Sequence, residues 1–107
     1  MGRSGRVYYK NMLTGLIEET GSGFRFVYDK DYLLSPDFPA ISLTLPKRAE
    51  SYESPVLFPF FYGLLAEGIL KQTQCRKLKL DENDHFGRLL KTAHADVIGA
   101  ITVIEVT

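Results

Sequence analysis

The first quarter of the chain alternates strand-forming runs with turn residues, and this pattern limits the possible folds more than any other feature. β-Branched and aromatic residues recur in Val7–Tyr9, Leu13–Glu19 and Phe24–Tyr28. Lys10-Asn11 separates the first two runs and Gly21-Ser22-Gly23 the last two, and glycine supplies the positive φ that tight hairpins need. The sequence therefore predicts an antiparallel meander over residues 6–28.

A further strand is predicted over Ala40–Leu45, where apolar residues alternate with Ser42 and Thr44. Ser35–Pro39 precedes it and contains two prolines, which predict a loop because proline fixes φ and cannot donate a backbone hydrogen bond. Pro46 ends the predicted strand.

Residues 47–54 are mostly polar and show neither the helical nor the strand period, which indicates an exposed connection. Tyr52 is the one aromatic residue in this stretch. Two interpretations of Tyr52 remain open, since it could be pinned against the domain or offered to a partner.

After Ser54 the pattern becomes helical, with proline acceptable in a first turn and Gly68 as an expected helix stop. Two more helices are expected over Ile69–Leu80 and Asn83–Ala95. The second has Asn83 or Asp84 as candidate N-caps. Its expected buried stripe consists of Phe86, Leu89, Leu90 and Ala93.

The C-terminal segment Val97–Val106 is rich in Val and Ile and is expected to return to the sheet. Strands followed by helices and a closing strand predict an α+β fold, with an antiparallel or mixed sheet and about three helices between. A length of 107 residues fits one domain, residues 1–107.

Charge and cysteine content narrow the classes of function. Thirteen basic and thirteen acidic residues give a net charge of zero, so the chain has no long-range field to attract nucleic acid. A local basic run at Lys71, Arg76, Lys77 and Lys79 is interpreted as a solvated helix face, with a phosphate-binding patch as the weaker alternative. The single cysteine and the lack of a long apolar stretch favour a cytoplasmic protein without a membrane segment.

The residues that could carry chemistry form no convincing catalytic set. His85 and His94 are out of phase on one helix, so they are expected to face solvent rather than to bind a metal. Glu18 and Glu19 point to opposite faces of a strand and cannot readily act as an acid–base pair. The sequence therefore predicts neither an enzyme nor a cofactor or metal site.

The most unusual segment is an aromatic run that begins at Leu57 and ends at Leu65. On a short helix, 100° steps spread such side chains around the axis, so some are expected to face a partner. Exposed aromatic clusters are typical interface anchors. The candidate partner-binding residues are Phe58, Phe60, Phe61, Tyr62, Leu64, Leu65 and Glu67. The alternative is that the small domain sandwiches this helix on both sides.

Three ordered motifs carry a resemblance to a known family: Phe60-Phe61-x-x-Leu64-Leu65-x-Glu67-Gly68, Asp84-x-Phe86-x-x-Leu89-Leu90 and Asp96-x-x-Gly99-Ala100-Ile101-x-Val103-Ile104. Over essentially its whole length the chain resembles the N-terminal subdomain of HipA-type serine/threonine kinases. It departs from the family pattern at Gly63, Ala66 and His94, which affects local loop geometry.

The resemblance implies that the kinase machinery lies in later domains of such proteins, and therefore not in this chain. Because the chain starts at Met1 and ends soon after the closing strand, it is expected to stand alone and looks like the HipS antitoxins. In three-component HipB/HipS/HipT systems, the resemblance then implies a HipT-like kinase toxin as partner, neutralised in trans, and a HipB-like DNA-binding protein in a ternary complex. The alternative is a structural subdomain or scaffold that does not inhibit.

Overall fold

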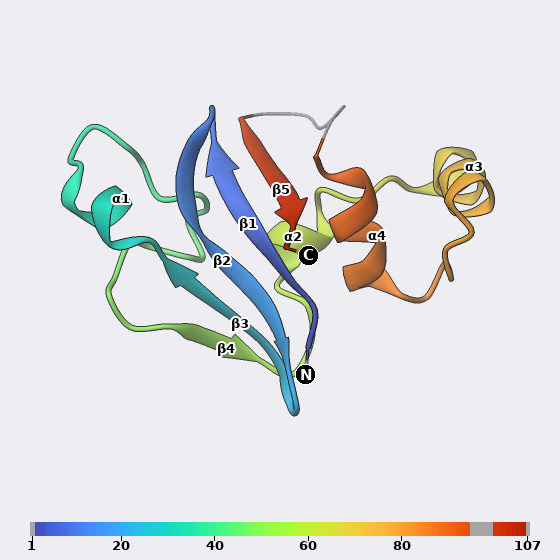
Figure 1. Ribbon diagram of the computed structural model, residues 1–107, viewed down its shortest axis with the longest axis horizontal. Helices are drawn as coiled ribbons and strands as arrows, with labels where there is room; N and C mark the ends of the chain where they lie inside the picture. The colour runs from blue at the N-terminus through green and yellow to red at the C-terminus, as the bar shows by residue number, and fades with distance from the viewer. Residues whose placement is uncertain (1, 95–99, 107) are drawn as a thin grey trace.

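The computed structural model describes residues 2–94 and 100–106. Its centre is a five-stranded sheet with the strand order β4-β3-β2-β1-β5 (Figure 1). All four neighbouring pairs are antiparallel. The strands are β1 (Ser4–Tyr9), β2 (Met12–Thr20), β3 (Gly23–Tyr28), β4 (Tyr52–Ser54) and β5 (Ile101–Glu105).

The predicted meander is confirmed as β1, β2 and β3. Lys10 and Asn11 form the first turn with φ values of 50° and 83°, in the left-handed region that tight hairpins use. The second connection is the two-residue turn before Gly23. A Cβ at Gly23 would lie 2.2 Å from the carbonyl oxygen of Ser54, so glycine is required where β4 approaches β3.

Four helices lie in the described residues: α1 (Lys30–Leu34), α2 (Pro59–Tyr62), α3 (Gly68–Leu78) and α4 (His85–Thr92). The candidate N-cap Asp84 is confirmed, since its carboxylate accepts a hydrogen bond from the Gly87 amide at 3.1 Å. Asp29 caps α1 in the same way, through the amide of Asp31. The predicted α+β class is therefore confirmed, with α1 as a helix that the sequence did not indicate.

The hydrophobic core lies between one face of the sheet and the helices α2 and α4. Phe24 and Phe26 of β3 point to this face, where their rings meet Phe86 of α4 at 5.3 Å and Phe61 of α2 at 5.6 Å. The expected stripe of α4 is confirmed as core: Phe86, Leu89, Leu90 and Ala93 are all buried. α3 lies outside α4, away from the sheet (Figure 1).

The predicted strand over Ala40–Leu45 is wrong. This segment is a bend with an isolated bridge between Ser42 and Leu45, and Leu43 is fully exposed. Tyr28 explains the difference, because its buried hydroxyl accepts a hydrogen bond from the Ile41 amide and donates one to the Leu45 carbonyl. Burial raises the pKa of Tyr28, so the hydroxyl stays protonated and can donate.

The prediction of a wholly exposed connection over residues 47–54 is also wrong at its end. Tyr52 pairs with Phe26, and β4 completes one edge of the sheet. The Tyr52 hydroxyl donates to the Pro46 carbonyl at 2.5 Å, and the Arg48 guanidinium lies 3.7 Å from the centre of its ring. Of the two interpretations of Tyr52, the structure shows that it is pinned.

The prediction that Gly68 stops a helix is wrong. Gly68 is the first residue of α3, and its φ of 63° is one that L side chains rarely adopt. The helices predicted over Ile69–Leu80 and Asn83–Ala95 are confirmed as α3 and α4; α3 begins one residue earlier than predicted, and Ala95 lies outside the described residues. The closing strand is confirmed at Ile101–Glu105, whereas residues 97–99 of the predicted segment lie outside the described residues.

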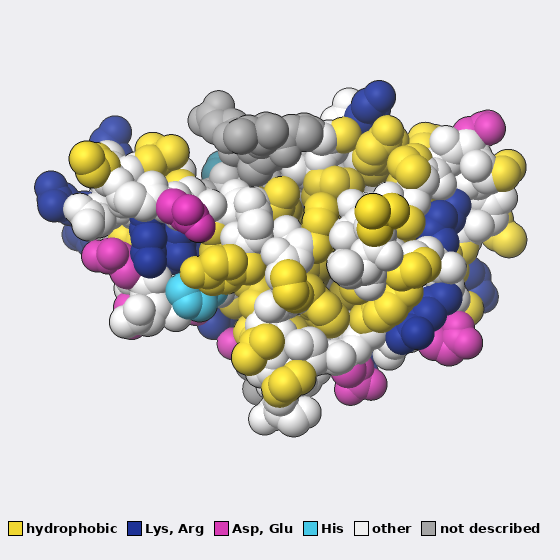
Figure 2. All heavy atoms as spheres, turned by 180° about the vertical axis from the view of Figure 1, so that it is seen from behind, with side chains coloured by type: hydrophobic (Ala, Val, Ile, Leu, Met, Phe, Trp, Pro, Cys, Tyr) yellow, Lys and Arg dark blue, Asp and Glu magenta, His cyan; other side chains and the backbone are white. Residues whose placement is uncertain are grey.

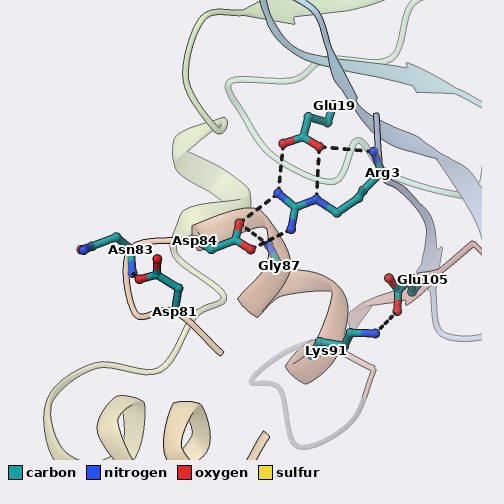
Figure 3. A network of polar contacts seen from close by, with 8 residues as sticks. All are labelled: Arg3, Glu19, Asp81, Asn83, Asp84, Gly87, Lys91 and Glu105. Carbon is teal, nitrogen blue, oxygen red and sulfur yellow. Dashed lines mark hydrogen bonds and ion pairs between the residues drawn. The ribbon is translucent and has the colours of Figure 1, made fainter. Parts of the chain in front are cut away.

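Arg3 ties the start of the chain to β2 and α4 (Figure 3). Its guanidinium donates to Glu19 at 3.0 Å and to Asp84 at 2.7 Å, with two hydrogen bonds to each carboxylate. Its hydrogen bonds hold the pKa of both carboxyl groups below their ordinary values. The network thereby links the N-cap of α4 to β2, the central strand of the sheet.

Candidate partner-binding site

The aromatic segment folds as a single helical turn, α2, which is followed by tight turns over residues 63–65. Pro59 is the first residue of the turn, where a backbone amide would make no hydrogen bond within the helix, so the lack of an N–H in proline costs nothing. Gly63 ends it, and its amide donates to the Pro59 carbonyl at 2.9 Å. A turn this short is not stable alone, so its position depends on the side chains that it buries.

Three of the seven candidate contact residues belong to the core. Phe61 has no exposed surface, and Phe58 and Leu65 are 7% and 8% exposed. Phe61 packs between Phe26 and the rings of Phe58 and Phe60, at 5.2 to 6.3 Å. The domain buries these three side chains, which hold α2 in place, and their contact with a partner stays a prediction.

The other four candidates keep exposed surface. Tyr62 is 43% exposed, Glu67 is exposed, and Phe60 and Leu64 are half-buried at the edge of the core. The short turn accordingly has an inner side, which fixes it, and an outer side, which a partner can reach. Partner binding by these four residues stays a prediction.

Phe60 and Leu64 line an apolar groove of about 260 Å³. Its other walls come from the end of β1, the loop after α1 and the start of β5, through Tyr9, Ala40, Ile41, Ala100 and Ile101. Figure 2 shows hydrophobic side chains gathered across the middle of the face seen from behind. Grooves with few polar groups and aromatic walls are typical docking sites for apolar side chains.

The opposite flank of α2 is polar. A pocket of about 210 Å³ is lined by Tyr62, Leu65, Ala66, Glu67, Gly68, Lys71 and Arg88. The Tyr62 ring meets His85 edge to face at 5.0 Å. Glu67 lies at the N-terminus of α3 without a side-chain capping hydrogen bond. The α2 turn thus separates an apolar groove from a charged pocket.

Sequence reasoning missed two contributors to these surfaces. Ile41 was assigned to a strand, although it lines the groove from a loop held by tyrosine hydroxyls. Arg88 was not singled out, although it is 3% exposed and lines the pocket. The helical period gave no signal for it, because Arg88 lies on the side of α4 opposite to the stripe of Phe86 and Leu89.

Two further expectations can be compared with the described residues. Within residues 2–94 and 100–106, no three His, Cys, Asp or Glu side chains gather as a possible metal site. No helix in this part of the chain has the length and apolar character needed to cross a membrane. Cys75 is buried in α3.

Comparison with known proteins places the chain in a family. The family model described as HipA N-terminal domain matches residues 5–104, and the chain therefore belongs to this family. The chain is similar to a solved structure of the N-terminal domain of HipA toxin, with 31% identity and a TM-score of 0.73, covering 98% of this chain and 93% of that one.

A relative in Haemophilus influenzae, described as an uncharacterized protein, is 35% identical over 103 residues. The match covers 96% of this chain and 92% of the relative. The resemblance drawn from the sequence motifs is thus confirmed at the level of the family. The similarity is to the N-terminal domain and not to the catalytic domain of a kinase.

Proposed function

We propose that this chain is a HipS-type antitoxin, which binds a HipT-type serine/threonine kinase toxin in the cytoplasm and neutralises it. The observation that carries the proposal is the outer side of α2, where Phe60, Tyr62 and Leu64 leave apolar surface uncovered on a domain of the HipA N-terminal family. The similar solved structure is the N-terminal domain of a toxin, HipA, so a domain of this family occurs there as part of the toxin chain. A separate copy of it would supply the same surface in trans.

The proposed mechanism is binding without chemistry on this chain. Aromatic side chains such as Tyr62 at the centre of an interface often supply much of the binding energy, because they bury large areas with few rotatable bonds. The core residues beneath them, Phe58, Phe61 and Leu65, fix the turn before binding. Such pre-organisation lowers the entropy lost on association. Neutralisation would follow if the docked turn occupies or distorts the catalytic cleft.

The alternative function is a structural one, in which the domain completes or scaffolds a HipA-like kinase complex without inhibiting it. The similarity to the N-terminal domain of the HipA toxin supports this alternative equally. A HipB-like DNA-binding protein is proposed as a third member of either complex. The net charge of zero supports leaving DNA binding to that member.

The test is co-purification with a HipT-type kinase from the same genome, followed by growth rescue in cells that express the kinase. A complex that restores growth is the expected result. A complex without rescue would favour the scaffold, and no complex would refute both.

A matched pair of variants locates the surface. Leu64→Arg places a charge at the groove and is expected to abolish rescue. Leu34→Arg makes the same change on α1, where the side chain is 78% exposed, and is expected to leave rescue intact. Thermal unfolding of both variants is the control: equal midpoints would show that a loss of rescue does not come from a loss of folding.

A further inference from the structure

The charged pocket beside α2 contains a buried cation that no anion of the described chain neutralises. Arg88 is 3% exposed, and none of the ion pairs in the described residues includes it. Its two hydrogen-bond partners carry no negative charge: the Ala66 carbonyl at 2.5 Å and the Nδ1 of His85 at 3.3 Å. Arginine stays protonated in proteins, so its positive charge remains buried.

Buried charges are normally paired, because an ion removed from water without a counter-charge loses its hydration uncompensated. Arginine has five N–H donors, and each of the two terminal nitrogens of Arg88 makes one hydrogen bond. Arg88 is one of the residues that line the pocket beside α2. The missing counter-charge can therefore come from a ligand.

The other walls of the pocket also favour an anion. Lys71 adds a second cation from the first turns of α3. The N-cap residue Glu67 makes no side-chain capping hydrogen bond, and the first turn of α3 holds no acidic residue, so its backbone amides lack side-chain acceptors. A Cβ built on Gly68 would meet nothing within 4 Å, which leaves the approach to these amides open.

One group in the pocket opposes an anion. Glu67 lines it and carries a negative charge. The two cations outweigh this single carboxylate, and the helix N-terminus adds a further partial positive charge. Three kinds of donor therefore converge: a guanidinium fork, an ammonium group and free backbone amides. This combination is the one that proteins use for phosphoryl groups.

We propose that this pocket binds a phosphoryl group, presented either as inorganic phosphate or as a phosphomonoester on a side chain. Arg88 supplies two parallel N–H donors, Lys71 the second charge, and the first amides of α3 the remaining hydrogen bonds. The weaker interpretation of the basic run as a phosphate-binding patch then holds for Lys71 alone. The proposal does not depend on the antitoxin function and can fail separately from it.

The experiment is a titration of the ¹⁵N-labelled chain with inorganic phosphate at constant ionic strength, followed by NMR. Shifts confined to the amides of residues 68–71 and to the Arg88 side chain are expected. Phosphoserine with blocked termini forms the second arm. Shifts by both ligands, with tighter binding of phosphoserine, would identify a phosphorylated side chain as the source, and shifts by inorganic phosphate alone would identify the free ion.

Substitution of the buried Arg88 could unfold the domain, so the test uses variants of residues that are not buried. Lys71→Met is expected to weaken phosphate binding about five-fold or more, as expected for loss of a charge-assisted contact. Lys77→Met removes the same charge from the exposed end of α3 and is expected to change nothing. Glu67→Gln is expected to tighten binding. Equal weakening by both lysine variants, or no localised shifts with any ligand, would overturn the proposal.

Discussion

α3 and α4 are consecutive helices with opposite relations to the core. α4 has 8 residues and buries five of them, whereas α3 has 11 residues and buries only Cys75. Three apolar residues of α3 face solvent, with Ile69 80%, Leu70 58% and Leu78 48% exposed. The longer helix therefore adds little to folding, since burial of apolar area is the main source of stability.

The same contrast recurs within α2. Its inner side anchors the turn in the core through Phe61, and its outer side leaves Tyr62 exposed. The sheet, α4 and the inner side of α2 thus form the stable frame. α3 and the outer side of α2 form most of the surface on which both proposals rest, and Arg88 of α4 completes the charged pocket.

The largest effect is expected from Phe61→Ala. Removing a fully buried aromatic ring leaves a cavity and is expected to destabilise the domain by about 3–5 kcal/mol. Chemical denaturation measures this change. Tyr62→Ala is the control, since its half-exposed ring is expected to cost less than about 1 kcal/mol. Similar losses in the two variants would contradict the two-sided description of α2.

Leu89→Ala tests the frame at α4. Leu89 has no exposed surface and lies in the core, so the free energy of unfolding should fall by about 2–5 kcal/mol. The midpoint of urea denaturation reports the change. A loss below 1 kcal/mol would mean that α4 packs no more tightly than α3.

Arg3→Met removes the network that joins the chain start, β2 and the N-cap of α4. The three side chains are 32% to 41% exposed, so the expected loss of stability is only about 1 kcal/mol despite the paired hydrogen bonds. Arg25→Met is the matched control, because Glu18 is the one carboxylate that Arg25 pairs with in the part of the chain that the structure describes. Its expected effect is smaller, and a larger effect would show that the network does not secure α4.

The same network predicts a dependence of stability on pH. The pKa values of Glu19 and Asp84 are lowered in the folded protein by Arg3. Lowered carboxyl pKa values stabilise the fold above the unfolded pKa, and this stabilisation is lost as the pH falls below about 4. Thermal unfolding between pH 7 and 3 should show a smaller decline for Arg3→Met than for the wild type. Identical declines would contradict the prediction.

The smallest effect is expected from Ile69→Ser combined with Leu70→Ser in α3. Both side chains are mostly exposed, so the stability should change by less than about 1 kcal/mol. Solubility should rise, because an apolar surface is removed. A loss comparable to that of Leu89→Ala would show that α3 belongs to the frame.

Sequence patterns predicted the frame better than the surfaces. Turn chemistry at Lys10-Asn11 and the α4 stripe are local signals, and both elements were found where expected. The alternation around Leu43 was misleading because the Tyr28 hydroxyl holds the backbone on either side of it, an effect of tertiary structure. β4 gave no signal, since an edge strand of three residues joins the sheet through its backbone.

The aromatic segment marked the right region but not its orientation. A helical turn of four residues carries no periodicity from which to choose an inner side, so Phe61 and Tyr62 could not be told apart. Arg88 was hidden for a different reason. Its burial depends on α2 and α3 folding back over α4, which local sequence does not encode.

The most direct test of the proposed function is transfer of labelled phosphate from ATP by a purified HipT-type kinase during titration with this chain. The account predicts that transfer falls to background near one equivalent, and that Leu64→Arg fails to suppress it while Leu34→Arg suppresses it fully. Unchanged or increased transfer at a chain concentration that saturates the kinase would contradict neutralisation and leave the scaffold as the function.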